Sequence, residues 1–263
     1  MFLAIDIGNT NIKIGIFDKK KLIGSFRLSS VVKRTSDEYG NDIISQLQRI
    51  LSSTTYTNNQ IKGIVISSVN PNLNYTFERL SEYYFDTTPI FVSPSLQTKI
   101  DYSLYQNQIG ADRIANCEGA INFFHSSSLI VIDCGTATSF NCIQNGKFVG
   151  GAIMPGLRTA ANSLSNAAAQ LANITLDIPS TAIGITTTAN MQSGILYGHI
   201  GAIEYLVNKM KQELSSKTKV IATGGLSEFL SKGTSVFDTI DRTLILTGLI
   251  EIYQNNTTNI FHS

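Results

Sequence analysis

Two short segments of the chain each place an aspartate two residues before a glycine. The first segment reads DIGNT, with Asp6 and Gly8, and the second reads DCGTAT, with Asp133 and Gly135. Glycine lets the backbone approach a ligand closely, and the small residues after it offer backbone and side-chain donors. Such a turn suits a phosphate group, with the aspartate beside a bound cation. Two turns of this kind could hold one nucleotide polyphosphate from both sides.

A simpler interpretation of each segment is a hairpin turn. A single Asp and Gly between two strands is usually only that, and one copy would favour it. Two copies, each followed by the same strand pattern, favour a nucleotide site instead. The glycine turn at Thr223, Gly224 and Gly225 agrees with this, although alone it fits a helix start equally well. The pattern G-x-x-x-x-G-K-[ST] is missing from the sequence, which excludes a P-loop nucleoside triphosphatase.

The elements predicted around the two turns follow a similar order in both halves of the chain. Alternating and buried apolar runs predict strands, and apolar residues at helical spacing predict helices. The predicted strands are 2–6, 11–17, 22–28, 61–69, 89–93, 129–135, 138–144, 147–154 and 219–226. The predicted helices are 39–51, 70–84, 157–171, 189–214 and 243–255. We therefore expect two similar α/β halves with a cleft between them, and a boundary near residues 110–124.

Size, charge and cysteine content limit the possible functions. The chain has 263 residues, enough for one large domain or two ordinary ones. A formal net charge of +1 gives no field that attracts nucleic acid or an anionic membrane. Three cysteines without a C-x-x-C pair favour reduced thiols in a cytosol. Since no apolar run is long enough for a bilayer span or a signal peptide, we expect a cytoplasmic protein that binds neither nucleic acid nor membranes.

Several motifs together resemble the type III pantothenate kinases. They are DIGNTNIKIGIF, GADRIAN, DCGTATS, GGAIMPG and MQSG, in the order found in that family and over nearly the whole chain. This family belongs to the superfamily of acetate and sugar kinases, heat-shock chaperones and actin. The resemblance implies an α/β fold of two actin-like (ribonuclease H-like) lobes, residues 1–115 and 116–263. Each lobe would be a mixed sheet with helices, and the two would surround a nucleotide cleft.

The activity implied by the resemblance is ATP-dependent phosphorylation of pantothenate to 4'-phosphopantothenate, the first step of coenzyme A biosynthesis. It implies ATP with Mg²⁺ and a monovalent cation, K⁺ or NH₄⁺, held by Asp133. It also implies a homodimer. The residues that match ATP contacts of the family are Asp6, Ile7, Gly8, Asn9, Thr10, Asn11, Ile12, Lys13 and Thr136.

The GADR segment matches the pantothenate-binding segment of the family. It comprises Gly110, Ala111, Asp112 and Arg113. Asp112 would be the general base that accepts the proton of the alcohol, and Arg113 would bind the substrate carboxylate or the moving phosphoryl group. The structural alternatives are a helix N-cap for Asp112 and a solvated helix residue for Arg113.

Two further substrate contacts are carried over from the family. Thr187 matches a substrate threonine because the Met-Gln-Ser-Gly motif follows it, and a helix cap is its structural alternative. The family also has a tyrosine before GADR, but the segment here lacks the usual proline. Counting back from the motif selects Ser103, while matching I-x-Y selects Tyr102, which we prefer; Tyr105 is the third option.

Two other functions fit parts of the pattern. A sugar or acetate kinase would share the phosphate turns, but GADR stands where a sugar-binding segment would be. A non-catalytic nucleotide-binding regulator, like a transcription accessory factor, would keep the fold and could lose the base. The joint presence of Asp6, Asp112, Arg113 and Asp133 favours catalysis. The near-neutral charge and the lack of a recognisable helix-turn-helix motif disfavour direct DNA binding.

Overall fold

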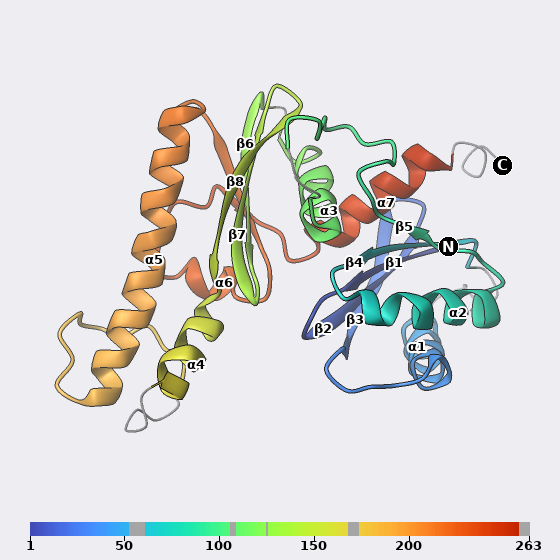
Figure 1. The fold of residues 1–263 in the computed structure, drawn as a ribbon, viewed down its shortest axis with the longest axis horizontal. Helices are drawn as coiled ribbons and strands as arrows, with labels where there is room; N and C mark the ends of the chain where they lie inside the picture. Colours follow the sequence, from blue (N-terminus) through green and yellow to red (C-terminus); the bar gives the residue numbers. More distant parts are fainter. Residues whose placement is uncertain (53–60, 106–108, 125, 168–173, 258–263) are drawn as a thin grey trace. The chain divides into compact units, whose positions relative to one another are not determined.

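The computed structural model describes residues 1–52, 61–105, 109–124, 126–167 and 174–257. The chain forms two compact units, which are described separately (Figure 1). The first unit comprises Met1–Ile100, Tyr105–Asn122 and Thr243–Ser263, and the second comprises Asp101–Leu104 and Phe123–Arg242.

The first unit is built on a five-stranded mixed sheet with the order β3-β2-β1-β4-β5. Its strands are β1 (Phe2–Ile7), β2 (Asn11–Asp18), β3 (Lys21–Ser29), β4 (Gly63–Ser68) and β5 (Ile90–Phe91). The first three strands pair antiparallel, whereas β4 and β5 join parallel to β1 and β4. The central strands β1 and β4 are almost entirely buried, as expected for strands covered on both faces.

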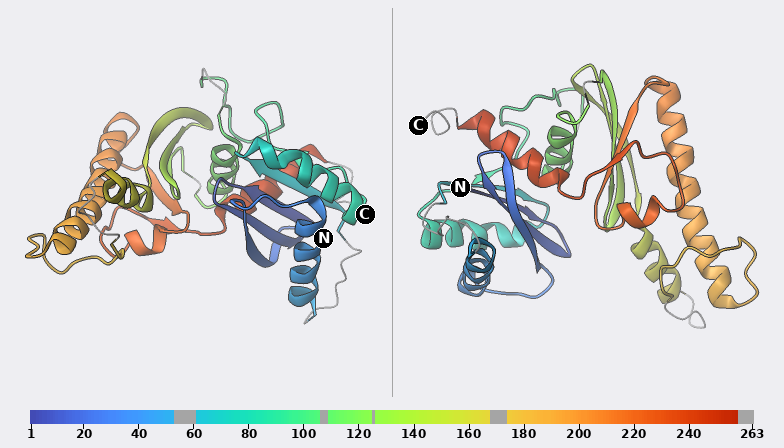
Figure 2. Two further views of the ribbon diagram at one scale, coloured as in Figure 1. Left: turned by 60° about the horizontal axis from the view of Figure 1, so that its bottom comes forward. Right: turned by 180° about the vertical axis from the view of Figure 1, so that it is seen from behind.

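Helices cover both faces of this sheet (Figures 1 and 2). They are α1 (Ser36–Leu51), α2 (Asn74–Phe85), α3 (Ala111–Ala120) and α7 (Leu244–Asn256). Leu3, Ile5 and Ile7 of β1 belong to the core cluster that contains the buried residues of α1 and α2. Side chains alternate along a strand, so Phe2, Ala4 and Asp6 point to the opposite face, where the Phe2 ring contacts Tyr253 of α7.

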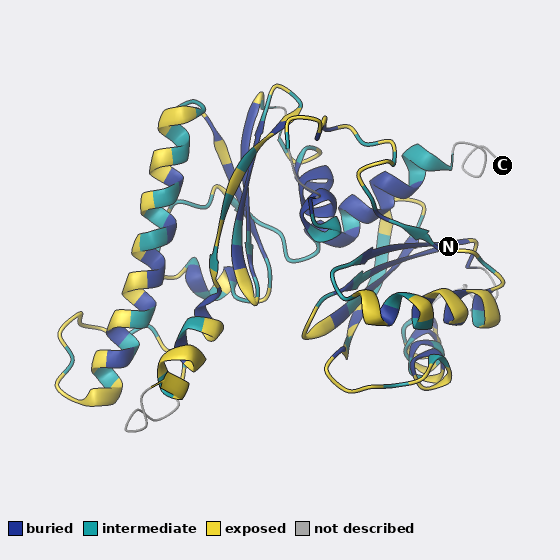
Figure 3. Ribbon diagram, viewed as in Figure 1, coloured by how far each residue is buried: buried dark blue, intermediate teal, exposed yellow. Residues whose placement is uncertain are grey.

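The second unit repeats this topology. Its sheet has the order β10-β9-β6-β7-β8, which equals the first order when it is read from β8. The strands are β6 (Ser128–Cys134), β7 (Ala137–Gln144), β8 (Lys147–Pro155), β9 (Lys219–Thr223) and β10 (Thr239–Ile240). The helices are α4 (Leu157–Ala167), α5 (Thr187–Glu213) and α6 (Ser227–Leu230). Figure 3 shows the buried residues of α5 on the side facing the sheet. The prediction of two similar halves is confirmed.

The two units do not meet at a single boundary between residues 115 and 116, which is where the resemblance placed the division between the lobes. Residues 116–122 and the whole of α7 belong to the first unit, although α7 follows the second unit in sequence. Helix α7 is buried nearly all round, from Leu244 to Tyr253. Such a helix must pack against several elements, and periodicity does not show which ones. Among the residues that the structure describes, no helix has both the length and the apolar character needed to cross a membrane.

A buried carboxylate on α7 holds two other segments of the first unit. Glu251 accepts hydrogen bonds from Lys20 Nζ at 2.7 Å and from Lys99 Nζ at 2.8 Å. Burial alone would raise the pKa of Glu251, but the hydrogen bonds and charges of both lysines outweigh it and lower this pKa below its ordinary value.

Glu251→Gln is therefore expected to lower the free energy of unfolding by about 1–3 kcal/mol at neutral pH. Since the folded-state pKa is lowered, this stabilisation is present above the unfolded-state value of about 4.3 and disappears as the pH falls through the folded-state value. Urea unfolding of both proteins over a pH series measures the difference. Glu228→Gln is the control, because the Glu228–Arg242 pair is exposed and contributes little. Equal losses in the two variants would contradict the prediction.

Candidate functional site

The first phosphate-type turn joins β1 to β2 in the first unit. The last paired residues are Ile7 and Ile12, and the backbone N–H of Gly8 donates to Asn11 O at 3.0 Å. Asn9, Thr10 and Asn11 are exposed at the tip, whereas Ile7 and Ile12 are buried. The buried neighbours anchor the turn, and the exposed donors remain accessible to a ligand.

Asp6 lies just before this turn, on β1, and a residue of the neighbouring strand β4 holds its side chain. It pairs with Ser67 of the parallel strand β4, and Ser67 Oγ donates to Asp6 Oδ1 at 3.1 Å. By strand alternation, the Asp6 side chain is on the face of the sheet that α7 covers. Ser67 follows the apolar residues of β4 and belongs to none of the motifs, so the sequence pattern does not indicate it.

The second turn joins β6 to β7 in the second unit and is one residue shorter. Its last pair is Cys134 and Thr138, and Gly135 N donates to Ala137 O at 3.0 Å. The carbonyl of the exposed Thr136 accepts from Gly156 N at 3.0 Å and from Thr159 Oγ1 at 2.6 Å. These bonds attach the beginning of α4 to the turn.

Two glycines pack closely against the second turn. A Cβ atom on Gly156 would collide with the carbonyl oxygens of Gly135 and Thr136. A Cβ on Gly224 would collide with Asp133 Oδ1 and the backbone of Cys134, and Gly224 has a φ of +91°. Side chains rarely adopt such a φ, so glycine is required there. The structure thus places the third glycine turn beside Asp133.

The oxygen atoms at each turn are suitable ligands for hard cations. They are carboxylate, carbonyl and hydroxyl oxygens, which Mg²⁺ and K⁺ prefer over soft ligands. Among the described residues, no three or more His, Cys, Asp or Glu side chains form a group that could hold a metal ion. Each turn has one carboxylate, and a single carboxylate suits a magnesium ion that is held mainly by nucleotide phosphates.

The GADR segment begins α3 in the first unit. Gly110 is the N-cap residue with an extended backbone, so Asp112 is the second helical residue and not the cap. Asp112 Oδ1 accepts from Arg113 N at 2.8 Å. Burial raises the pKa of Asp112 above its ordinary value, and the N–H and charge of Arg113 offset this rise only in part. A carboxylate of raised pKa is suited to accept a proton.

Arg113 is buried and stacks on an aromatic ring. It is only 9% exposed, so it is not the solvated helix residue of the alternative interpretation. Its Cζ atom is 5.3 Å from the ring centroid of Tyr105, and its Nη1 donates to Tyr105 Oη at 3.2 Å. Tyr102 instead packs in the second unit, with its ring 5.7 Å from that of Phe148. Of the three residues considered before GADR, Tyr105 thus has a described contact to that motif.

The beginning of α3 lies close to the strand ends of the first sheet. Val69 N, just after β4, donates to Ile7 O at 3.0 Å. A Cβ on Gly110 would be 4.0 Å from Val69 Cγ1 and 2.5 Å from Asp112 Oδ1. Residues of GADR and the end of β1 thus share Val69 as a neighbour. The first turn and GADR, far apart in sequence, belong to one compact unit.

Thr187 is the first residue of α5 in the second unit, and it is exposed. The cap of this helix is Thr186, whose Oγ1 accepts from Ala189 N at 3.1 Å. Thr186, and not Thr187, therefore caps this helix, so the alternative role of Thr187 as a helix cap is wrong.

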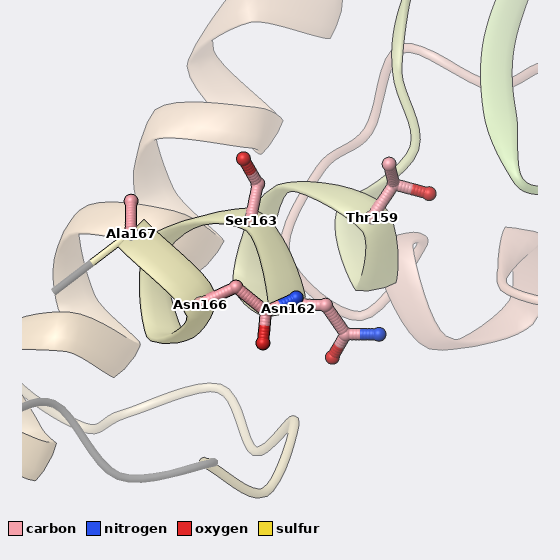
Figure 4. Close-up of a pocket in the computed structure, with 5 residues that line it drawn as sticks. All are labelled: Thr159, Asn162, Ser163, Asn166 and Ala167. Atoms are coloured by element: carbon pink, nitrogen blue, oxygen red, sulfur yellow. The ribbon is translucent and has the colours of Figure 1, made fainter. Parts of the chain in front are cut away.

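A separate hollow lies along α4 (Figure 4). Among the described residues, it is lined by Thr159, Asn162, Ser163, Asn166 and Ala167. None of these side chains titrates near neutral pH, so they supply no acid or base. This hollow therefore offers no acid–base chemistry of its own.

Comparison with known proteins gives a match to one family. The family described as type III pantothenate kinase matches residues 2–209.

Solved structures of several kinds share the fold. A proposed transcriptional activator of the Baf family from Campylobacter jejuni is 23% identical, with a TM-score of 0.62, and 97% of this chain and 99% of that chain are covered. A proposed 2-dehydro-3-deoxygalactonokinase from Sinorhizobium meliloti is 12% identical, with a TM-score of 0.60 and coverage of 97% and 98%. Component A of (R)-2-hydroxyglutaryl-CoA dehydratase from Acidaminococcus fermentans is 14% identical, with a TM-score of 0.54 and coverage of 96% of both chains. These similarities establish the fold and not the substrate.

Proposed function

The chain belongs to the type III pantothenate kinase family, and we propose that it transfers the γ-phosphoryl group of ATP to the terminal hydroxyl group of pantothenate. The product would be 4'-phosphopantothenate, the first intermediate on the way to coenzyme A. The observation that carries this proposal is Asp112, a partly buried carboxylate of raised pKa at the beginning of α3.

Phosphoryl transfer requires mainly positioning and charge neutralisation. In this proposal, Asp112 accepts the proton of the pantothenate hydroxyl as the bond to phosphorus forms. Arg113 binds the carboxylate of pantothenate or the transferred group, since its guanidinium suits planar oxygen pairs. The stacking on Tyr105 holds the guanidinium in place.

The two turns would bind the nucleotide. Residues Asp6 to Lys13 would hold the phosphates through backbone N–H groups and the Lys13 ammonium group, and Thr136 would contact ATP. Mg²⁺, brought with ATP and oriented by Asp6, would neutralise phosphate charge. We also propose that Asp133 holds K⁺ or NH₄⁺ and that Thr187 contacts pantothenate.

We further propose that the protein is a cytoplasmic homodimer, because it belongs to this family. A regulator without catalysis is the less favoured alternative, because the chain has every carboxylate that the reaction needs: Asp6, Asp112 and Asp133. The description of the Campylobacter protein as a transcriptional activator applies to that protein. At 23% identity, its similarity to this chain shows the fold alone.

The test of the proposed function is ADP release from MgATP with pantothenate as the acceptor, in KCl and in NaCl. We expect a rate several-fold higher in KCl, because Asp133 would hold the cation beside the phosphates. Asp133→Asn should remove the difference between the salts. Pantothenate-dependent ADP release that is equal in both salts would contradict the cation assignment, and no such release would contradict the function.

The choice between Tyr105 and Tyr102 is a separate prediction. The I-x-Y match favours Tyr102, whereas the described contact with Arg113 favours Tyr105. Tyr105→Phe removes that hydrogen bond and keeps the ring, so we expect the KM for pantothenate to rise about 3- to 10-fold. Tyr102→Phe is the matched variant, since its ring packing against Phe148 would persist. Steady-state kinetics decide: a KM increase confined to Tyr102→Phe would reverse the assignment.

A further inference from the structure

Ser67 is a buried polar residue that none of the family motifs includes. It is 0% exposed and lies near the end of β4, after the apolar residues Ile64, Val65 and Ile66. Its hydroxyl group donates to Asp6 Oδ1 at 3.1 Å. Ser67 and Asp6 are direct register partners on parallel strands, so both side chains leave the sheet on the same face.

We propose that Ser67 is a positioning residue that fixes the carboxylate of Asp6 for its role beside the nucleotide phosphates and their cation. This inference rests on the proposed function of Asp6. A carboxylate can rotate about its Cβ–Cγ bond, and a hydrogen bond to one oxygen restricts this rotation. A bond to a charged acceptor is also stronger than a bond between neutral groups. Such supporting contacts orient groups that bind cations.

The second unit supports this interpretation with the same arrangement of residue types. Asp133 precedes the second turn, and its register partner on the parallel strand β9 is Thr223. Thr223 is 2% exposed and follows Val220, Ile221 and Ala222, which are fully buried. Each half therefore has a buried hydroxyl residue directly after the apolar residues of a strand, opposite the aspartate. Packing alone would favour another apolar residue at both positions.

A buried serine can also satisfy its hydroxyl group locally, without any role in a site. Ser81 on α2 does so, because its Oγ donates to Phe77 O of the same helix at 2.7 Å. Ser81 is 0% exposed, belongs to the same unit as Ser67 and lies in none of the proposed site segments. Its replacement therefore provides a matched control for the loss of a buried hydroxyl group.

The first test is calorimetric binding of a non-hydrolysable ATP analogue with Mg²⁺, which needs no phosphoryl acceptor. For Ser67→Ala we expect the Kd to rise about 10-fold or more, as for other supporting contacts of cation sites. Ser81→Ala should leave the Kd unchanged. Ser67→Cys keeps the volume with a weaker donor and should give an intermediate Kd. It replaces Ser67→Ala in the test if the alanine variant does not fold. Unchanged nucleotide binding by a folded Ser67 variant would overturn the proposal.

A double-mutant comparison shows whether Ser67 acts through Asp6. In the Asp6→Asn background, Ser67→Ala should not weaken nucleotide binding further, because the carboxylate that Ser67 orients is absent. An equal loss in both backgrounds would mean that Ser67 acts independently and would overturn the proposal. A Kd that responds to Ser67 in a protein unable to phosphorylate pantothenate would reject the acceptor and not the role of Ser67.

Discussion

Asp112→Asn is expected to lower kcat for pantothenate phosphorylation by about 100-fold or more, the contribution typical of a general base. Asparagine has the shape of aspartate but cannot take the proton from the hydroxyl group. Its side-chain oxygen can still accept the hydrogen bond from Arg113 N, so the first turn of α3 should persist. The KM for MgATP should change little, since the nucleotide turns are intact.

The pH dependence of the activity provides a second test of the role of Asp112. Since burial raises the pKa of Asp112, activity should rise with pH through a value above the ordinary carboxyl range of about 3.9. This rise should disappear in Asp112→Asn. Burial also disfavours the charged carboxylate, so the neutral variant should be at least as stable as the wild type at neutral pH.

The control for Asp112 is Asp37→Asn, which changes a first-turn aspartate of α1 in the same unit. Its kcat should equal that of the wild type. A variant at Asp112 that keeps most of the activity would leave the kinase assignment intact but would remove Asp112 from the role of base.

Gly248→Ala is expected to reduce the free energy of unfolding by about 1–3 kcal/mol or more, as overpacking does. Helices α3 and α7 approach each other at two glycines. A Cβ on Gly248 would collide with Ala115 O, and one on Gly119 would collide with Leu244 O. Both obstacles are backbone atoms, which cannot rotate away, so the helices must separate.

Gly201→Ala on α5 is the matched control for Gly248→Ala, because a Cβ there would meet no atom within 4 Å. Alanine is favoured over glycine inside a helix by about 1 kcal/mol, so this control should be neutral or stabilising. Thermal and urea unfolding measure both variants. Helix α3 begins with Asp112 and Arg113, so a folded Gly248→Ala protein should also lose activity. Equal stability of the two alanine variants would contradict the proposed close approach.

The strands and turns were predictable because their signals are local. Residues 2–6 are a continuous apolar run that ends at Asp6, and residues 11–17 alternate, so the sequence itself contains both strands and the turn between them. The repetition of this pattern at Asp133 predicted two similar halves, which the strand orders confirm. Helix α7 was also predicted, from its long apolar stretch.

Other features depend on tertiary contacts, which local patterns do not contain. Strand β10 has two residues and helix α6 has four, too short for any periodic signal. The association of α7 with the first unit arises from the close approach at Gly119 and Gly248. Within GADR, the motif indicated Asp112, but its raised pKa follows from burial.

The contacts that support the candidate residues were the least predictable. Ser67 resembles any small residue in a buried strand until its register against Asp6 is known. Tyr105 contacts Arg113 eight positions away, across a segment where the family spacing is not kept. The roles of the substrate residues, including Thr187 and Tyr102, remain predictions from the resemblance.

The most direct test of the proposed function identifies the phosphorylated product. The protein would be incubated with MgATP and KCl in the presence of pantothenate, glucose and acetate at equal concentrations, and the products would be separated and identified by mass spectrometry. We predict 4'-phosphopantothenate and ADP as the products. A phosphorylated sugar or acetyl phosphate instead, or no phosphorylated acceptor from folded protein that binds ATP, would contradict the proposal.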